Sequence, residues 1–346
     1  MSVSTEKGKG EAMDTVDGFD GIWIEKYRPK SFGDVISHDH IISTISRLMD
    51  ADRLPHLLFY GPPGTGKTST IIACARQLYG PKYKSHILEL NASDDRGIDV
   101  VRNQIKDFAG TRQIFSKGLK LIVLDEADSM TKDAQAALRR TIERYTSNTR
   151  FCLICNYVNK IIPALQSRCT RFRFSPLNLE QIQPRLDDII QQENVNITDD
   201  GRKAILDLSG GDMRKVLNIL QAAHMAYDVV NANNVYSCTG NPLPSDIREL
   251  VSWMLNDSFK NAFDKIAKLK TEKGLALQDI LREVHLYALR LELPDIVQAE
   301  LIHCLAEVDY RLSAGTDEEL QLASMVGALQ KARDNVSMDV EQDNSQ

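Results

Sequence analysis

The sequence predicts an α/β domain with a parallel sheet, followed by two helical domains. Two observations lead to this prediction. Short apolar runs alternate with amphipathic stretches from residue 57 to residue 176, which is the pattern of a doubly wound sheet with helices on both faces. Beyond Ser175 and Pro176 the apolar spacing becomes helical and stays helical to residue 334.

Five short runs rich in apolar residues are expected to form the strands. They are residues 57–60, 87–90, 121–124, 151–155 and 171–174. The third run is apolar throughout, as expected for a strand at the centre of a parallel sheet. Residues 69–78, 98–108, 132–145 and a short segment around 161–165 are expected to be the intervening helices. Past residue 176, helices are expected at 179–193, 199–208 and 212–224, and a further helical block at 246–334.

The same patterns predict the domain boundaries. We expect the α/β domain at 21–176, a small helical domain at 177–240 and a second helical domain at 241–334, with a linker around residues 241–244. Residues 1–20 hold two lysines and five carboxylates, and residues 334–346 hold four carboxylates and no base. Such composition is typical of disordered tails, expected at 1–20 and 335–346.

Composition narrows the class of protein. The chain has 346 residues, 42% of them hydrophobic and 26% charged, as in soluble globular proteins of two or three domains. Its apolar stretches are shorter than the roughly 18 residues of a membrane span, so no membrane partner is expected. The six cysteines are scattered, which favours a reducing intracellular compartment. Cys152 and Cys155 have the spacing of a metal or redox motif, but they lie inside an expected central strand, and a structural role is favoured.

Charge is unevenly distributed along the chain. The net charge is −6, which by itself argues against a polyanionic partner. Between Arg139 and Arg173, however, eight cations accompany a single carboxylate, Glu143. A basic surface on an acidic protein is therefore possible, and the net charge does not exclude nucleic acid.

Residues 61–68 carry the strongest functional signal. They fit the pattern G-x-x-x-x-G-K-[ST] between an expected strand and an expected helix, where a phosphate-binding loop must lie. Glycines allow the backbone N–H groups to point at a phosphate, and the helix N-terminus adds partial positive charge. The predicted nucleotide contacts are Gly61, Pro62, Pro63, Gly64, Thr65, Gly66, Lys67, Thr68 and Ser69. Lys67 is expected to reach the β- and γ-phosphates, and the Thr68 hydroxyl to hold Mg²⁺.

Two carboxylates follow the apolar run 121–124. Asp125 is expected to associate with Mg²⁺, and Glu126 to polarise the attacking water, because these groups belong at the carboxyl end of this strand in a P-loop ATPase. Asp128 is the more ambiguous carboxylate and could serve only as a cap for the next helix.

Three more polar residues lie at places where catalytic groups are expected. Asn156 ends the strand 151–155 and could orient the water or contact the γ-phosphate. Arg168 follows the short helix and could reach a neighbouring chain's phosphates in trans. Arg214 follows an expected Asp212 N-cap and could pair with phosphate oxygens. Each could instead be an ordinary surface or capping residue.

Taken in order, these motifs resemble the AAA+ ATPases, and among them the small subunits of clamp loaders such as eukaryotic replication factor C. Residues 23–29 (Trp-Ile-Glu-Lys-Tyr-Arg-Pro), 90–97 and 165–169 (Leu-Gln-Ser-Arg-Cys) are similar to segments specific to that family. The resemblance covers roughly residues 23–334. One departure is Ser37-His38, where many members have Gly followed by Gln or Asn.

The resemblance implies roles for the domains and for individual residues. The α/β domain would be an AAA+ ATPase domain, the middle domain a helical lid, and the last domain a collar that assembles five different subunits. Ile24, Arg28 and Ile36 would line the adenine pocket, Asn156 would be sensor 1 and Arg214 sensor 2. Arg168 would be the arginine finger of an adjacent subunit's site.

The resemblance also implies cofactors, partners and location. ATP and Mg²⁺ would drive the opening of the sliding clamp PCNA and its loading at primer–template junctions, in the nucleus, during DNA replication and repair. Arg96, Arg102 and Lys160 are candidates to contact DNA phosphates without sequence preference, or else to form ion pairs within the chain.

Three alternatives stay open at this point. The chain could be a structural ring member whose nucleotide site does not turn over, although Lys67, Thr68 and Glu126 are all present. It could be a subunit shared with alternative clamp loader complexes. It could also be a different AAA+ remodeller, such as a Holliday-junction motor.

Overall fold

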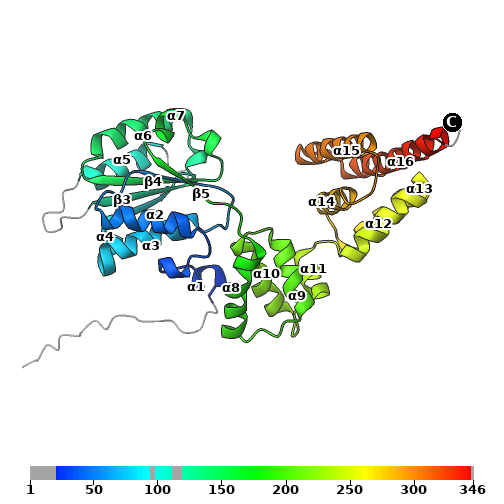
Figure 1. Cartoon of the computed structure of the whole chain (residues 1–346), viewed down its shortest axis with the longest axis horizontal. Helices are drawn as coiled ribbons and strands as arrows, with labels where there is room; N and C mark the ends of the chain where they lie inside the picture. The colour runs from blue at the N-terminus through cyan, green and yellow to red at the C-terminus, as the bar shows by residue number, and fades with distance from the viewer. Residues whose placement is uncertain (1–20, 94–97, 111–118, 344–346) are drawn as a thin grey trace, which may run out of the picture. The chain divides into compact units, whose positions relative to one another are not determined.

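The computed structural model describes residues 21–93, 98–110 and 119–343. A five-stranded parallel sheet has the order β2-β3-β4-β1-β5 (Figure 1). The strands are β1 Leu57–Tyr60, β2 Ile87–Asn91, β3 Lys120–Asp125, β4 Thr149–Cys155 and β5 Thr170–Arg173. Each predicted strand matches one of these to within two residues at either end, and the α/β fold class is confirmed.

Helices cover both faces of this sheet (Figure 1). They are α1 Trp23–Lys26, α2 Asp39–Asp50, α3 Lys67–Tyr79, α4 Tyr83–His86, α5 Ile98–Gly110, α6 Lys132–Tyr145 and α7 Pro163–Gln166. Helices α2 and α3 pack on one face, whereas α5, α6 and α7 pack on the other. Helix α2 is not among the helices expected from the sequence, although its Ile41 and Ile45 are fully buried.

Successive strand residues point to opposite faces, so each strand contributes to two apolar layers. Phe59 and Cys152 belong to the layer under α2 and α3, while Leu58 and Cys155 belong to the layer under α6. This two-sided burial is the reason that the central strands are apolar along their length. Because the thiols of Cys152 and Cys155 lie in different layers, they cannot ligate one metal ion together.

The strand register fixes where the polar strand ends meet. Leu153 of β4 pairs with Leu58 of β1 on one side and with Leu124 of β3 on the other. The carboxyl ends of β1, β3 and β4 are therefore level at one edge of the sheet, which is the place where ligands bind in open parallel sheets.

The remainder of the chain is helical. Its helices are α8 Leu179–Gln192, α9 Asp199–Ser209, α10 Met213–Ala226, α11 Ala232–Thr239, α12 Pro244–Asn256, α13 Phe259–Lys273, α14 Leu277–Ala288, α15 Asp295–Ser313 and α16 Glu318–Asp343. Helix α16 extends beyond residue 334, into the segment that the sequence assigns to a tail. None of the helices in the described ranges is long and apolar enough to cross a bilayer.

Contacts divide the chain into two compact units. The first holds the described residues up to Leu186 together with Ser209–Asn218, so the start of α10 belongs with the sheet. The second holds Asp187–Leu208 and the residues from Ile219 onward. In the second unit, α12 to α16 share a core that includes Leu250, Ile280 and Val326. The five-part division expected from the sequence remains a prediction.

His56 is a buried polar residue just before β1. Its Nδ1 accepts a hydrogen bond from the Phe151 N–H at 3.1 Å, and its Nε2 lies 3.2 Å from Thr146 Oγ1. A ring nitrogen that accepts carries no proton, so the imidazole is neutral with its proton on Nε2. Burial, and secondarily the charge of Arg150, lower the pKa of His56 to about 4.

This lowered pKa predicts a pH-dependent stability of the sheet. Because the unfolded chain takes up the proton near pH 6.5 and the folded chain only near pH 4, the free energy of unfolding should fall as the pH drops through this window. His56→Asn keeps a side-chain acceptor for the Phe151 N–H and cannot titrate. Urea unfolding at pH 7 and pH 5, monitored by hydrogen exchange of β4 peptides, measures the free energy of unfolding. Between these two pH values it should fall more in the parent chain than in the variant. Equal losses would contradict the prediction.

Candidate active site

The loop at residues 61–68 has a backbone that requires glycine at three positions. Gly61, Gly64 and Gly66 have φ values of 143°, 69° and 90°, which side-chain-bearing residues rarely adopt. Space is also lacking, because a Cβ on Gly61 would lie 2.0 Å from the Phe174 carbonyl oxygen. A Cβ on Gly64 would lie 1.6 Å from Asp212 Oδ1. The loop is thus enclosed by the end of β5 and by the start of α10.

Lys67 is buried within this loop. Its Nζ donates hydrogen bonds to the carbonyl oxygens of Gly61 and Pro62, both at 2.7 Å. It also donates to Asn156 Oδ1 at 3.0 Å. The side chain expected to contact phosphates and the side chain expected to sense them are therefore in direct contact. Strand order explains this contact, since β1 and β4 are adjacent.

The surroundings of Lys67 disfavour the charged form of its side chain. Burial lowers the pKa of its ammonium to about 8, the positive charge of Arg214 adds to the shift, and the carboxylate of Asp125 opposes it. A triphosphate would supply the negative charge that this site lacks and would raise the pKa again.

Thr68 and Asp125, the two residues predicted to hold Mg²⁺, are in direct contact. The Thr68 hydroxyl donates to Asp125 Oδ2 at 2.8 Å across 57 residues of sequence. Asp125 Oδ1 accepts from the Glu126 N–H at 2.9 Å, which orients the carboxylate. A hydroxyl beside a carboxylate offers hard oxygen donors, and Mg²⁺ bound to phosphates takes one or two such protein ligands. The residues present fit this ion.

Glu126 has a strained backbone and an exposed side chain. Its φ of 53° is in the left-handed region, which is unfavourable for a residue with a Cβ. Such strain persists only where the surroundings enforce it, and it is concentrated at functional sites. The Glu126 carbonyl accepts hydrogen bonds from the Ser129 N–H and hydroxyl, which hold the turn.

Asp128 has a role that the sequence did not reveal. Its Oδ2 accepts from the N–H groups of Asn156 and Tyr157 at 3.3 and 3.2 Å. It therefore holds the turn after β4 that carries Asn156, rather than the N-terminus of the next helix. That helix, α6, is capped instead by Thr131, whose side chain accepts from Ala134.

Helix α10 begins against the phosphate-binding loop. Asp212 Oδ1 accepts from the N–H groups of Arg214 and Lys215 at 2.8 and 3.3 Å, as expected of an N-cap. The Met213 N–H donates to the Gly64 carbonyl at 3.4 Å. These contacts bring the first turn of α10, and with it Arg214, to the site of Lys67.

The residues expected at the adenine base lie in the N-terminal segment. Ile24, Arg28 and Ile36 are half-buried, and Arg28 pairs with Glu25 at 3.3 Å. Val35, next to Ile36, lies 3.7 Å from the point where a Cβ on Gly66 would be. This segment is therefore beside the phosphate-binding loop.

Ser37 and His38 follow with φ values of 66° and 65°. A positive φ favours glycine at position 37, and Ser37 adopts this conformation at a cost in conformational energy. His38 is buried against the Phe174 ring at a centroid distance of 4.8 Å, and within the described structure its Nε2 has no hydrogen-bond partner.

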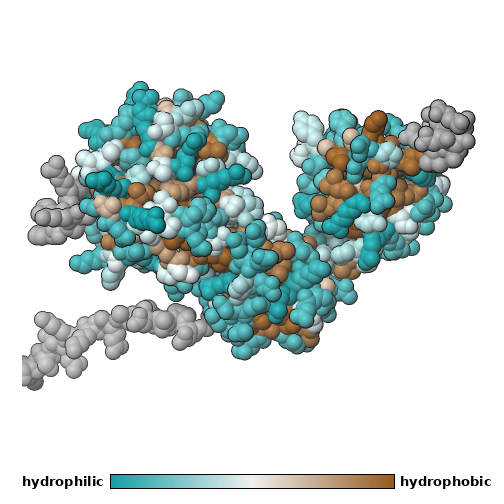
Figure 2. All heavy atoms as spheres, in the orientation of Figure 1, coloured by the Kyte–Doolittle hydropathy of each residue, from teal (hydrophilic) through white to brown (hydrophobic). Residues whose placement is uncertain are grey.

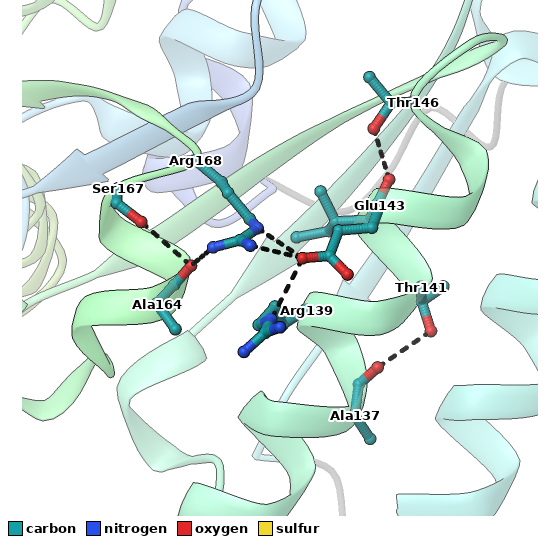
Figure 3. Close-up of polar contacts among 9 residues, drawn as sticks. Ala137, Arg139, Thr141, Glu143, Thr146, Ala164, Ser167 and Arg168 are labelled. Carbon is teal, nitrogen blue, oxygen red and sulfur yellow. Dashed lines mark hydrogen bonds and ion pairs between the residues drawn. The ribbon is translucent and has the colours of Figure 1, made fainter.

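Arg168 is not among the residues gathered at Lys67. Its guanidinium contacts Glu143 of α6 and the Ala164 carbonyl of α7 (Figure 3). Of the three candidate DNA contacts, Arg96 lies outside the described residues, as does the side chain of Arg102 in α5. Lys160 is exposed, with its Nζ 5.1 Å from the centroid of the Tyr157 ring.

Two family models match this chain, one over the sheet domain and one over the C-terminal helices. A family model described as "ATPase family associated with various cellular activities (AAA)" matches residues 57–177, and one described as "Replication factor C C-terminal domain" matches residues 242–328. Replication factor C subunit 5 of Mus musculus is 60% identical over 313 residues, covering 90% of this chain and 92% of the mouse protein. Replication factor C subunit 3 of Schizosaccharomyces pombe is 53% identical over 337 residues, covering 96% and 98%.

A similar fold occurs among solved structures. The RuvB Holliday junction branch migration motor of Thermotoga maritima superposes with a TM-score of 0.51 at 16% identity, covering 78% of this chain and 93% of that one. At this identity the likeness shows the fold alone.

The lowered pKa of Lys67 predicts proton uptake when a nucleotide binds. At pH 8.5 a large share of the free chain should carry a neutral Lys67, and phosphate charge should restore its proton, so binding should take up a fraction of one proton. Calorimetric titration with MgATP in two buffers of different ionisation enthalpy measures this number. Uptake should fall toward zero at pH 7, and Lys67→Arg, which stays charged, is the matched control. Uptake independent of pH, or retained in the arginine variant, would contradict the assignment.

Proposed function

This chain belongs to the replication factor C family of AAA ATPases, and from that premise we propose that it works as one subunit of a clamp loader. In this proposal it binds and hydrolyses ATP in a nuclear hetero-pentamer that opens the PCNA sliding clamp and loads it at primer–template junctions during DNA replication and repair. The observation that carries the proposal is the convergence of Lys67, Thr68, Asp125, Asn156 and the start of α10 at one edge of the sheet.

The geometry suggests a division of labour among these residues. Lys67 would exchange its hydrogen bonds to loop carbonyls for bonds to phosphate oxygens, while Asn156 would report whether the γ-phosphate is present. Thr68 and Asp125 would hold Mg²⁺, which neutralises charge on the transferred phosphoryl group. Glu126, exposed at the end of its strand, would orient and polarise the attacking water.

Arg214 and Asp212 would couple the nucleotide to the helical lid. The first turn of α10 is already bonded to the loop at Gly64, and Arg214 lies near enough to affect the pKa of Lys67. A γ-phosphate between Arg214 and the loop would add a charge-assisted contact, and hydrolysis would remove it. Movement of α10 would then signal the state of the nucleotide.

Assembly into a ring would let one subunit contribute an arginine to the nucleotide site of the next. Arg168, which lies away from Lys67, would serve as the arginine finger of a neighbouring subunit. Large exposed apolar side chains on the C-terminal helices support assembly there, among them Ile296 at 83% and Tyr310 at 75% exposed. Figure 2 shows hydrophobic residues gathered on the visible face of these helices. Exposed apolar surface of this kind marks interaction sites.

Contact with DNA would come from cations facing backbone phosphates. Lys160 is exposed after β4, and Arg96 and Arg102 remain candidates from the sequence alone. Such contacts would be independent of base sequence and weakened by salt.

A second candidate function is that of a ring member that binds nucleotide without turning it over. The contacts between Lys67 and Asn156 would also serve such a role, because they need only bind. The strained backbone of Glu126 favours the catalytic alternative. A Holliday-junction motor is disfavoured, because the RuvB likeness is one of fold while the replication factor C relatives match nearly the whole chain. Membership of alternative clamp loaders stays open, and co-purification of partner subunits would test it.

Replacing Glu126 with Gln distinguishes the two candidates. The amide keeps the size of the side chain and loses its ability to polarise water, so hydrolysis at this site should fall by about 10²–10⁴-fold while ATP affinity is kept. The measurement is single-turnover ATP hydrolysis and PCNA loading by the assembled complex carrying the variant. Unchanged turnover and loading would show that this site is not catalytic.

Replacing Arg168 with Ala tests the proposed contribution in trans. In the assembled complex, hydrolysis at the neighbouring subunit's site should fall by roughly 10³-fold or more, because a charge that stabilises the transition state is lost. Nucleotide binding to the isolated variant chain, measured by calorimetry, should match the parent. Loss of ATP binding by the isolated chain would instead place Arg168 at its own nucleotide.

A further inference from the structure

The guanidinium of Arg168 is held along one edge by a carboxylate of its own chain (Figure 3). Its Nε and Nη2 both donate to Glu143 Oε1, at 2.9 and 2.5 Å. Its Nη1 donates to the Ala164 carbonyl oxygen at 2.7 Å. These bonds use three of the five N–H donors of the side chain. They join Arg168 to α6 through Glu143 and to α7 through Ala164.

We propose that Glu143 is a positioning residue for Arg168, fixing the guanidinium so that its remaining N–H donors can meet a phosphate oxygen of the neighbouring subunit. This inference rests on the proposed trans role of Arg168. The fork of a guanidinium is planar and rigid, so a carboxylate on the Nε and Nη2 edge also determines the direction of the Nη1 and Nη2 end.

The charge balance of the cluster suits this role. Arg139, one turn before Glu143 on α6, donates from Nε to the same Oε1 at 3.2 Å. Two cations therefore share one anion, and the cluster keeps a net positive charge that a phosphate can meet. The hydrogen bonds from Arg139 and Arg168 lower the pKa of Glu143, so it stays ionised at neutral pH. Glu143 is the single carboxylate between Arg139 and Arg173.

The exposure of the cluster argues against a role in holding the fold together. The side chains of Arg168 and Glu143 are 33% and 42% exposed, and ion pairs in contact with solvent contribute little to stability. Orientation is worth more to a reaction, because an arginine that is already placed loses less freedom when it meets the transition state. Removal of Glu143 should therefore affect hydrolysis more than folding.

The test compares four forms of this chain in the assembled complex: Glu143→Ala, Glu143→Gln, Arg168→Ala, and the double variant Glu143→Ala with Arg168→Ala. The readouts are kcat and KM for ATP hydrolysis at the neighbouring subunit's site. Glu143→Ala should lower kcat roughly tenfold with KM unchanged. The kcat of Glu143→Gln should lie between those of the parent and of the alanine variant, because the amide oxygen can accept the same hydrogen bonds but carries no charge. The double variant should be no slower than Arg168→Ala alone.

Asp199→Ala is the matched control. Asp199 pairs with Arg202 at 3.8 Å in α9, so its loss removes an exposed ion pair from a helix that has no part in the proposed assembly surface or in the nucleotide site. This variant should hydrolyse ATP like the parent. Size-exclusion chromatography checks assembly of every variant, and Glu143→Gln, which keeps the side-chain shape, carries the test if the alanine variant does not assemble.

The results distinguish the positioning role of Glu143 from the trans role of Arg168. If Arg168→Ala slows hydrolysis while both Glu143 variants match or exceed the parent, the positioning role is overturned and the trans role stands. A further slowing by Glu143→Ala in the Arg168→Ala background would also overturn it, because Glu143 would then act by another route. If Arg168→Ala itself has no effect at the neighbouring site, the trans role fails and the positioning role fails with it.

Discussion

The parallel pairing of β1 with β4 on one side and β5 on the other is the constraint on which the site depends. It places the loop after β1 beside the end of β4, so that Lys67 meets Asn156 across 89 residues of sequence. It also brings the Phe174 carbonyl so close to Gly61 that no side chain fits there. The packing on both faces of the sheet keeps this register, because a shift by one residue would exchange the side chains of the two apolar layers and disrupt their fit to the covering helices.

The site is organised around a cation that lacks a full counter-charge. Lys67 is buried among backbone carbonyls, an amide oxygen and the field of Arg214, with Asp125 as the opposing charge. Preparing such a site costs folding free energy, and a bound polyanion recovers that cost because it supplies the missing charge. Affinity for the nucleotide and instability of the empty loop are thus two results of the same arrangement.

Much of the fold and of the site could be predicted from local sequence. The strands could be found because burial on both faces leaves them apolar along their length, and the loop because its glycines and Lys67 follow a fixed spacing. Helix α2 was missed although Ile41, Ile45 and Met49 recur at helical spacing; its start has no capping signal, since His38 at the N-cap has a left-handed backbone and makes no side-chain capping bond. The bonds from the backbone of Asn156 to Asp128, and from Arg168 to Glu143, join separate elements, and no local pattern encodes them.

The close approach of Gly64 to Asp212 has a consequence for how this chain can vary. The loop and the first turn of α10 are separated by well over a hundred residues, yet each occupies space that the other must leave free. The phosphate-binding loop therefore cannot be exchanged without regard to the segment at the start of α10. A chimaera that takes the loop from one ATPase and the α10 segment from another would have to preserve this fit, so the two segments are expected to evolve as a matched pair.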